Sequence, residues 1–121
     1  MGTWTAEDLD RIGAAKELDI ATERRDGTLR SYLPIWVVRI GDDLYVRAYR
    51  GRGGSWFRQV QRHPRASILA GGVERSVSFV EADDDLRAAM DEAYRAKYGS
   101  GMYVDAMVAP SAAGAALKMV P

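Results

Sequence analysis

The segment Leu29–Ile40 reads LRSYLPIWVVRI, and its branched and aromatic residues predict a long β-strand. Pro34 lies inside this strand, although proline has no backbone N–H to donate to a neighbouring strand. We therefore expect the segment at a sheet edge or at a bulge. Tyr32, Trp36 and Val38 alternate along it, which is typical of side chains packed on one face of a sheet. Alternatively, a bulge at Pro34 frees backbone N–H and C=O groups that can bind the edge of a ring.

Further strands are predicted on both sides of this segment, because apolar residues alternate between turns rich in glycine and aspartate. The six predicted strands are residues 17–23, 29–40, 44–50, 66–70, 73–82 and 115–120. Asp26-Gly27, Gly41–Asp43 and Gly71-Gly72 supply the tight turns.

Three helices are predicted between these strands, at residues 6–16, 56–62 and 83–98. Thr5 is the expected N-cap of the first helix and Ser55 that of the second, while Gly99 ends the third. Hairpin-type connections dominate, so the sheet is expected to be mostly antiparallel. Six such strands can close into a small barrel, and we predict a single α+β domain over residues 1–121.

The composition excludes several function classes. The 121 residues are 47% hydrophobic and 28% charged, which favours a folded core over disorder. There is no cysteine, which excludes disulfides and thiolate chemistry and is compatible with the cytoplasm. His63 is the only histidine, so neither a zinc site nor a serine triad is expected. No signal peptide or membrane helix is predicted, because no apolar run approaches the ~20 residues that a span requires.

The formal net charge is zero, which argues against a general nucleic-acid binder. The charge is nevertheless unevenly distributed along the chain. Residues 44–73 contain six arginines and one histidine but no acid, whereas residues 81–92 contain six acids and one arginine. The basic segment therefore requires an explanation.

The candidate for chemistry is Val46–Arg58, which reads VRAYRGRGGSWFR and follows a predicted strand. Its glycines let the backbone turn and approach a ligand closely. The helix predicted after Ser55 presents free N–H groups to an anion. Four arginines in the segment can donate paired hydrogen bonds to a phosphate or carboxylate: Arg47, Arg50, Arg52 and Arg58.

Other interpretations of this segment remain open. It lacks the Gly-Lys-Ser/Thr ending of a Walker A motif and the βαβ setting of a dinucleotide fingerprint. It can be a surface loop with solvated arginines. Its aromatic residues can also stack on single-stranded bases, although the zero net charge disfavours that partner.

At these two segments the sequence resembles the flavin-binding split-barrel superfamily, which includes pyridoxamine-phosphate-oxidase-like and deazaflavin-dependent nitroreductase-like proteins. Basic and small residues lead into a Pro-Ile-Trp strand over residues 30–38. A Gly-rich loop follows at residues 47–54, and a short helix carries Trp56-Phe57 before His63-Pro64. The resemblance covers about residues 17–82.

The resemblance implies a split β-barrel, often dimeric, that binds FMN or a deazaflavin as its cofactor. It places the cofactor-binding residues in two groups, with Arg47, Tyr49, Arg50, Gly53, Gly54, Ser55 and Trp56 near the phosphate and ribityl chain, and Pro34, Ile35, Trp36 and Val37 along the ring. The apolar tail over residues 102–119 favours a homodimer. Tyr32 and Tyr49 are candidates to position or protonate a substrate.

Two functions are compatible with these expectations. The first is a flavin- or deazaflavin-dependent oxidoreductase with a small-molecule substrate. In that case the cofactor supplies the hydride chemistry, and no acid–base pair is needed. The second is a split-barrel binding module without catalytic activity or a redox cofactor.

Overall fold

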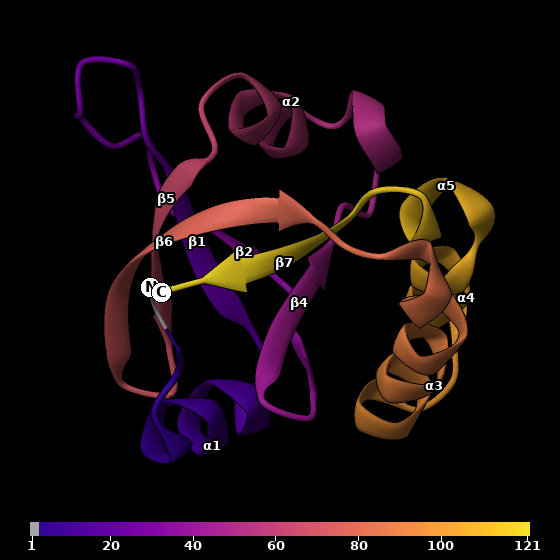
Figure 1. The fold of residues 1–121 in the computed structure, drawn as a ribbon. Helices are drawn as coiled ribbons and strands as arrows, with labels where there is room; N and C mark the ends of the chain where they lie inside the picture. The colour runs from indigo at the N-terminus through magenta and orange to yellow at the C-terminus, as the bar shows by residue number, and fades with distance from the viewer. Residues whose placement is uncertain (1–2) are drawn as a thin grey trace.

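The computed structural model describes residues 3–121, and its main element is an antiparallel sheet curled into a half-barrel (Figure 1). The strands of the described chain are β1 (Leu18–Thr22), β2 (Leu33–Ile35), β3 (Val38–Ile40), β4 (Asp43–Arg47), β5 (Arg65–Ala70), β6 (Val73–Glu81) and β7 (Ala116–Val120). Their spatial order is β2-β1-β5-β6-β7-β4-β3. The predicted α+β class and the antiparallel pairing are confirmed. The prediction that there is no signal peptide also concerns Met1 and Gly2, which lie outside the described residues.

The predicted strand at residues 29–40 is wrong, because the structure divides it into two. β2 pairs with β1 through Leu18 and Ile35, whereas β3 pairs with β4 through Val38 and Tyr45. These two strands form opposite edges of the sheet, so it has seven strands instead of six. Only Trp36 and Val37 connect them, and the step from residue 35 to residue 38 spans at most about 11 Å. The sheet must therefore curl until its two edges meet.

Side chains of the helix α3 (Arg87–Tyr98) hold this connection in place. The Val37 N–H donates to the Tyr98 hydroxyl at 3.2 Å, and this hydroxyl donates to the Lys16 carbonyl at 2.7 Å. The Lys97 ammonium donates to the Val37 carbonyl at 2.6 Å. The rings of Trp36 and Tyr98 stack with centroids 3.9 Å apart and planes 4° apart. The alternative of a bulge had nearby backbone groups free to bind a ring, but the N–H and C=O of Val37 are bonded to side chains of α3.

The remaining helices cover the ends and one side of the half-barrel (Figure 1). They are α1 (Ala6–Ala14), α2 (Ser55–Arg62), α4 (Met102–Val108) and α5 (Pro110–Ala113), with short 3₁₀ turns η1 (Gly51–Gly53) and η2 (Asp84–Leu86). Thr5 caps α1 as predicted, since its hydroxyl accepts from the Asp8 N–H at 3.1 Å. Gly54, and not Ser55, is the N-cap of α2. The sequence analysis did not assign α4 and α5.

Two apolar clusters explain why these elements pack together. The first fills the half-barrel with fully buried side chains such as Leu18, Ile68 and Phe57. The second lies between the sheet and α3 and includes Tyr45 and Tyr94. β4 is buried on both faces because alternate residues enter the two clusters. No helix within residues 3–121 combines the length and the apolar character that a membrane crossing requires.

The Tyr98 hydroxyl should contribute measurably to stability. In Tyr98→Phe the N–H of the fully buried Val37 loses its partner, while the stack on Trp36 is retained. A buried donor without a partner costs about 1–3 kcal/mol, so we expect the free energy of unfolding in urea to fall by that amount.

Tyr103→Phe is the matched control, because Tyr103 is 67% exposed. We expect it to change the free energy of unfolding by less than about 0.5 kcal/mol. Equal stability of the two variants would show that Tyr98 does not hold the connection between β2 and β3.

Candidate functional site

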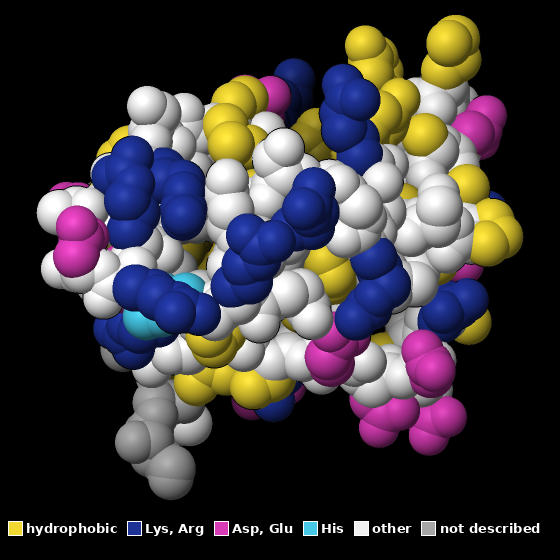
Figure 2. All heavy atoms as spheres, turned by 90° about the horizontal axis from the view of Figure 1, so that it is seen from above, with side chains coloured by type: hydrophobic (Ala, Val, Ile, Leu, Met, Phe, Trp, Pro, Cys, Tyr) yellow, Lys and Arg dark blue, Asp and Glu magenta, His cyan; other side chains and the backbone are white. Residues whose placement is uncertain are grey.

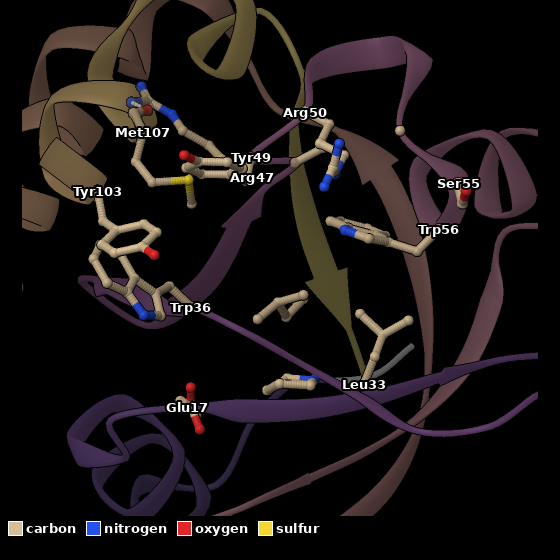
Figure 3. A pocket seen from close by; sticks show the side chains of 14 residues that line it. Glu17, Leu33, Trp36, Arg47, Tyr49, Arg50, Ser55, Trp56, Tyr103 and Met107 are labelled. Carbon is tan, nitrogen blue, oxygen red and sulfur yellow. Dashed lines mark hydrogen bonds between the residues drawn. The ribbon is translucent and has the colours of Figure 1, made fainter.

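A cavity of about 610 Å³ opens beside the connection between β2 and β3 (Figure 3). Its size lies within the range that binds small molecules and cofactors. Its walls come from β2, from the end of β4, from the start of α2 and from α4. The lining residues are Glu17, Leu33, Pro34, Ile35, Trp36, Arg47, Ala48, Tyr49, Arg50, Gly54, Ser55, Trp56, Tyr103 and Met107.

The structure brings together nine of the eleven residues that the sequence analysis placed at a cofactor. These are Pro34, Ile35, Trp36, Arg47, Tyr49, Arg50, Gly54, Ser55 and Trp56. The other two do not line the cavity. Val37 is fully buried, and Gly53 lies in the exposed turn η1.

Five lining residues were not among these candidates: Glu17, Leu33, Ala48, Tyr103 and Met107. Tyr103 and Met107 are four residues apart and so share one face of α4. That spacing was visible in the sequence, but the helix that carries it was not assigned. Glu17 lies between α1 and β1. In the sequence it is distant from residues 29–40 and 46–58, the two segments that suggested a site.

One end of the cavity presents a helix start and an exposed arginine. Gly54 precedes α2, no side chain caps this helix, and the first helical bond runs from the Arg58 N–H to the Gly54 carbonyl. The N–H groups of the helix start, at Ser55 and the two residues after it, are therefore unused within α2. A Cβ on Gly54 would lie 3.3 Å from the Arg50 Cβ, so glycine permits this close approach. Arg50 is exposed, and no acid within residues 3–121 pairs with it.

The structure gives Arg47 different partners from those expected. Its guanidinium is buried, forms an ion pair with Asp91, and donates to the Met107 carbonyl at 2.9 Å and the Arg87 carbonyl at 3.1 Å. It also lies 5.4 Å from the centre of the Tyr94 ring. Arg47 thus joins β4 to α3 and α4 through its two terminal nitrogens. Its buried Nε has no hydrogen-bond partner within residues 3–121.

The other arginines of the basic segment gather on the face that α2 covers (Figure 2). Arg52 pairs with Glu81 at 3.0 Å, and its hydrogen bond holds the Glu81 pKa below the ordinary value. Arg65 pairs with Glu23 at 3.1 Å. Within the described chain, Arg58 and Arg62 have no acidic partner and leave this face with positive charge.

Aromatic side chains form much of the cavity wall. Tyr49 and Tyr103 lie with ring centroids 5.9 Å apart, while Trp56 faces them from the side of Arg50 (Figure 3). Tyr32, the other tyrosine considered for a substrate, donates to the Ser67 hydroxyl at 2.9 Å and does not line the cavity.

Burial shifts the pKa values of groups behind this wall. It raises the pKa of Tyr98 to about 12 and lowers that of Lys97 to about 8. It also raises the pKa of Tyr94, whose hydroxyl has no hydrogen-bond partner. These side chains support the wall from behind and do not line the cavity itself.

A family model described as "Uncharacterized protein conserved in bacteria (DUF2255)" matches residues 8–119. No curated protein matches the chain significantly.

Several solved structures have a similar fold. A candidate pyridoxamine 5′-phosphate oxidase from Listeria innocua has a TM-score of 0.68 at 17% identity, over 95% of this chain and 90% of that one. An F420-H2-dependent reductase has a TM-score of 0.64 at 17% identity, over 88% and 94% of the two chains. An FAD-binding protein from Mesorhizobium loti has a TM-score of 0.61 at 18% identity, over 98% and 88%. The expected relation to split-barrel proteins is thus confirmed for the fold.

Substitution of Arg47 should affect stability far more than substitution of Arg50. Arg47→Met leaves Asp91 and two carbonyls without their buried partner, so we expect the free energy of unfolding to fall by about 3 kcal/mol. Arg50→Met should change it by less than about 0.5 kcal/mol, because Arg50 is exposed. Urea denaturation measures both values, and similar losses in the two variants would contradict the structural role of Arg47.

Proposed function

This chain belongs to the DUF2255 family of bacterial proteins, and we propose that it binds a flavin or deazaflavin cofactor and acts as an oxidoreductase. One observation carries the proposal. A single cavity with aromatic walls joins an uncapped helix start and an unpaired arginine to the Pro34–Trp36 segment. Solved proteins of similar fold include an F420-H2-dependent reductase and an FAD-binding protein, which is consistent with this proposal.

We propose that Arg50 and the start of α2 hold the cofactor phosphate. The N–H groups at Ser55 and Trp56 present partial positive charge, and the Arg50 guanidinium adds a full charge beside them. Ser55 is a lining residue of the cavity, and its side chain lies beyond Trp56 (Figure 3). We assign Arg47 a structural role, although it also lines the cavity, because both terminal nitrogens of its guanidinium donate to α3 and α4. Its buried Nε is the one guanidinium nitrogen without a hydrogen-bond partner within residues 3–121.

The part of the cavity between Arg50 and Glu17 fits a flat, largely apolar ring system. Pro34, Ile35 and Tyr49 line the cavity, and Trp36 borders it on the side of Glu17 (Figure 3). A bound flavin or deazaflavin would supply the hydride chemistry. The protein's contribution is then to hold the ring, to exclude water with its aromatic side chains and to orient the substrate. FMN and a deazaflavin present the same phosphate and ribityl chain, so both fit this arrangement.

Titration of the purified protein with FMN, and separately with the deazaflavin F420, tests the binding proposal. We expect Arg50→Ala to raise the Kd about 10- to 100-fold, since a hydrogen-bonded charge contributes about 1.5–3 kcal/mol. Quenching of cofactor fluorescence measures the Kd.

Arg62→Ala is the matched control, because Arg62 is an exposed arginine at the end of α2, outside the cavity. This variant should keep the Kd for the cofactor within about twofold of the wild-type value. Any additional change caused by the loss of one surface charge should disappear at high salt. Equal losses in both variants, or no binding of either cofactor to the wild type, would refute the proposed site.

A non-catalytic binding module remains the alternative function. The cavity lining contains one acid, Glu17, and no histidine, so it offers no acid–base pair of its own. The loaded protein therefore needs a redox test as well. The test measures the rate at which a nitroaromatic acceptor reoxidises the reduced cofactor. A faster rate on the protein than in free solution supports an oxidoreductase, and an unchanged rate supports the non-catalytic binding module.

We further propose a cytoplasmic homodimer. Met102 is 86% exposed at the start of α4, which is unusual for a large apolar side chain. Met102→Glu should therefore shift the protein from dimer to monomer in light scattering coupled to size exclusion. Wild type that is already monomeric would rule out this interface.

A further inference from the structure

Among residues 3–121, Glu17 is the only one with a carboxylate side chain that lines the cavity, and it lies at the end opposite Arg50 (Figure 3). Within residues 3–121 its carboxylate takes part in no hydrogen bond or ion pair. The negative charge at this end of the cavity is therefore not neutralised by the protein.

Aromatic rings surround the same end of the cavity. Tyr98 covers one face of Trp36, so only the other face is left for the cavity. Tyr103 is 67% exposed and lies beside Tyr49, with the two ring planes at 44°. Figure 3 shows Tyr103 and Trp36 on the same side of the cavity, above Glu17.

Rings and a carboxylate in this arrangement favour one class of ligand. The face of an aromatic ring carries partial negative charge and attracts cations, most strongly for tryptophan. A carboxylate adds a full negative charge and repels ligand carboxylates. The Arg50 end has the reverse preference. The cavity thus has an anion-binding end and a cation-binding end, separated by apolar side chains.

We propose that Glu17 determines substrate specificity, and that the Glu17 end of the cavity binds the positively charged group of an aromatic organic cation such as a quaternary ammonium compound. The proposal rests on the proposed function, in which the cofactor phosphate occupies the Arg50 end. Trp36 and Tyr103 contribute ring faces, and Glu17 contributes the charge. Neutral analogues bind more weakly, and anionic analogues are excluded.

Three probes of similar shape test this directly: benzyltrimethylammonium, benzyl alcohol and phenylacetate. Isothermal titration measures their affinities for the wild type, with and without saturating FMN. We expect the cation to bind about tenfold more tightly than the alcohol, and phenylacetate to bind least. Because the Glu17 carboxylate is exposed, high salt should reduce the preference for the cation.

Variants distinguish the contribution of the Glu17 charge to cation binding from that of the Tyr103 ring. Glu17→Gln should reduce the affinity for the cation about five- to tenfold and leave that for the alcohol unchanged. Glu74→Gln removes an exposed acid of β6 outside the cavity and should change neither affinity. Tyr103→Leu should weaken binding of the cation, whereas Tyr103→Phe should retain it because the ring is kept.

The outcomes distinguish this inference from the proposed function. If FMN binds but the cation and the alcohol bind equally, or Glu17→Gln leaves their ratio unchanged, the specificity proposal is wrong and the cofactor site stands. If the cation is preferred through Glu17 but neither FMN nor F420 binds, the cation site stands and the oxidoreductase proposal is wrong.

Discussion

The structure depends on one constraint, which is that two residues connect the two opposite edges of the sheet. Trp36 and Val37 leave β2 at one edge and enter β3 at the other, and so short a connection cannot bridge a flat sheet of seven strands. The sheet curls for this reason. The peptide groups of Val37 would then be buried without partners, but Tyr98 and Lys97 of α3 bond to them.

The same constraint places the cavity. The connection brings Pro34, Ile35 and Trp36 to the open side of the half-barrel, opposite the start of α2. Arg47 holds α4 against β4, because its buried guanidinium on β4 donates a hydrogen bond to the Met107 carbonyl on α4. The buried Arg47 is therefore structural, and Arg50 is the lining arginine that is exposed and forms no ion pair within residues 3–121.

Positive and negative side chains lie at opposite ends of the cavity, just as basic and acidic residues occupy separate segments of the chain. The end that we propose for the anion combines Arg50 with the helix start, and arginines without an acidic partner continue over the face of α2 (Figure 2). The other end holds Glu17 among aromatic rings. A ligand pair consisting of an anionic cofactor and a cationic substrate would satisfy both ends at once. The polar groups then set the orientation, while the aromatic walls supply most of the contact area.

By itself the sequence determined the α+β class, five of the strands and the cap at Thr5, because periodicity, turn residues and caps act locally. Nine of the fourteen cavity residues were expected at a cofactor from the resemblance to split-barrel proteins. Only the tertiary structure decided that residues 29–40 form two strands. Pro34 is compatible with both a sheet edge and a bulge, and which strands pair with this segment decides between them. The tertiary structure also decided that Arg47 pairs with Asp91, 44 residues away. Glu17 and Tyr103 joined the cavity for the same reason: which distant residues meet depends on how the sheet curls, and no local pattern encodes it.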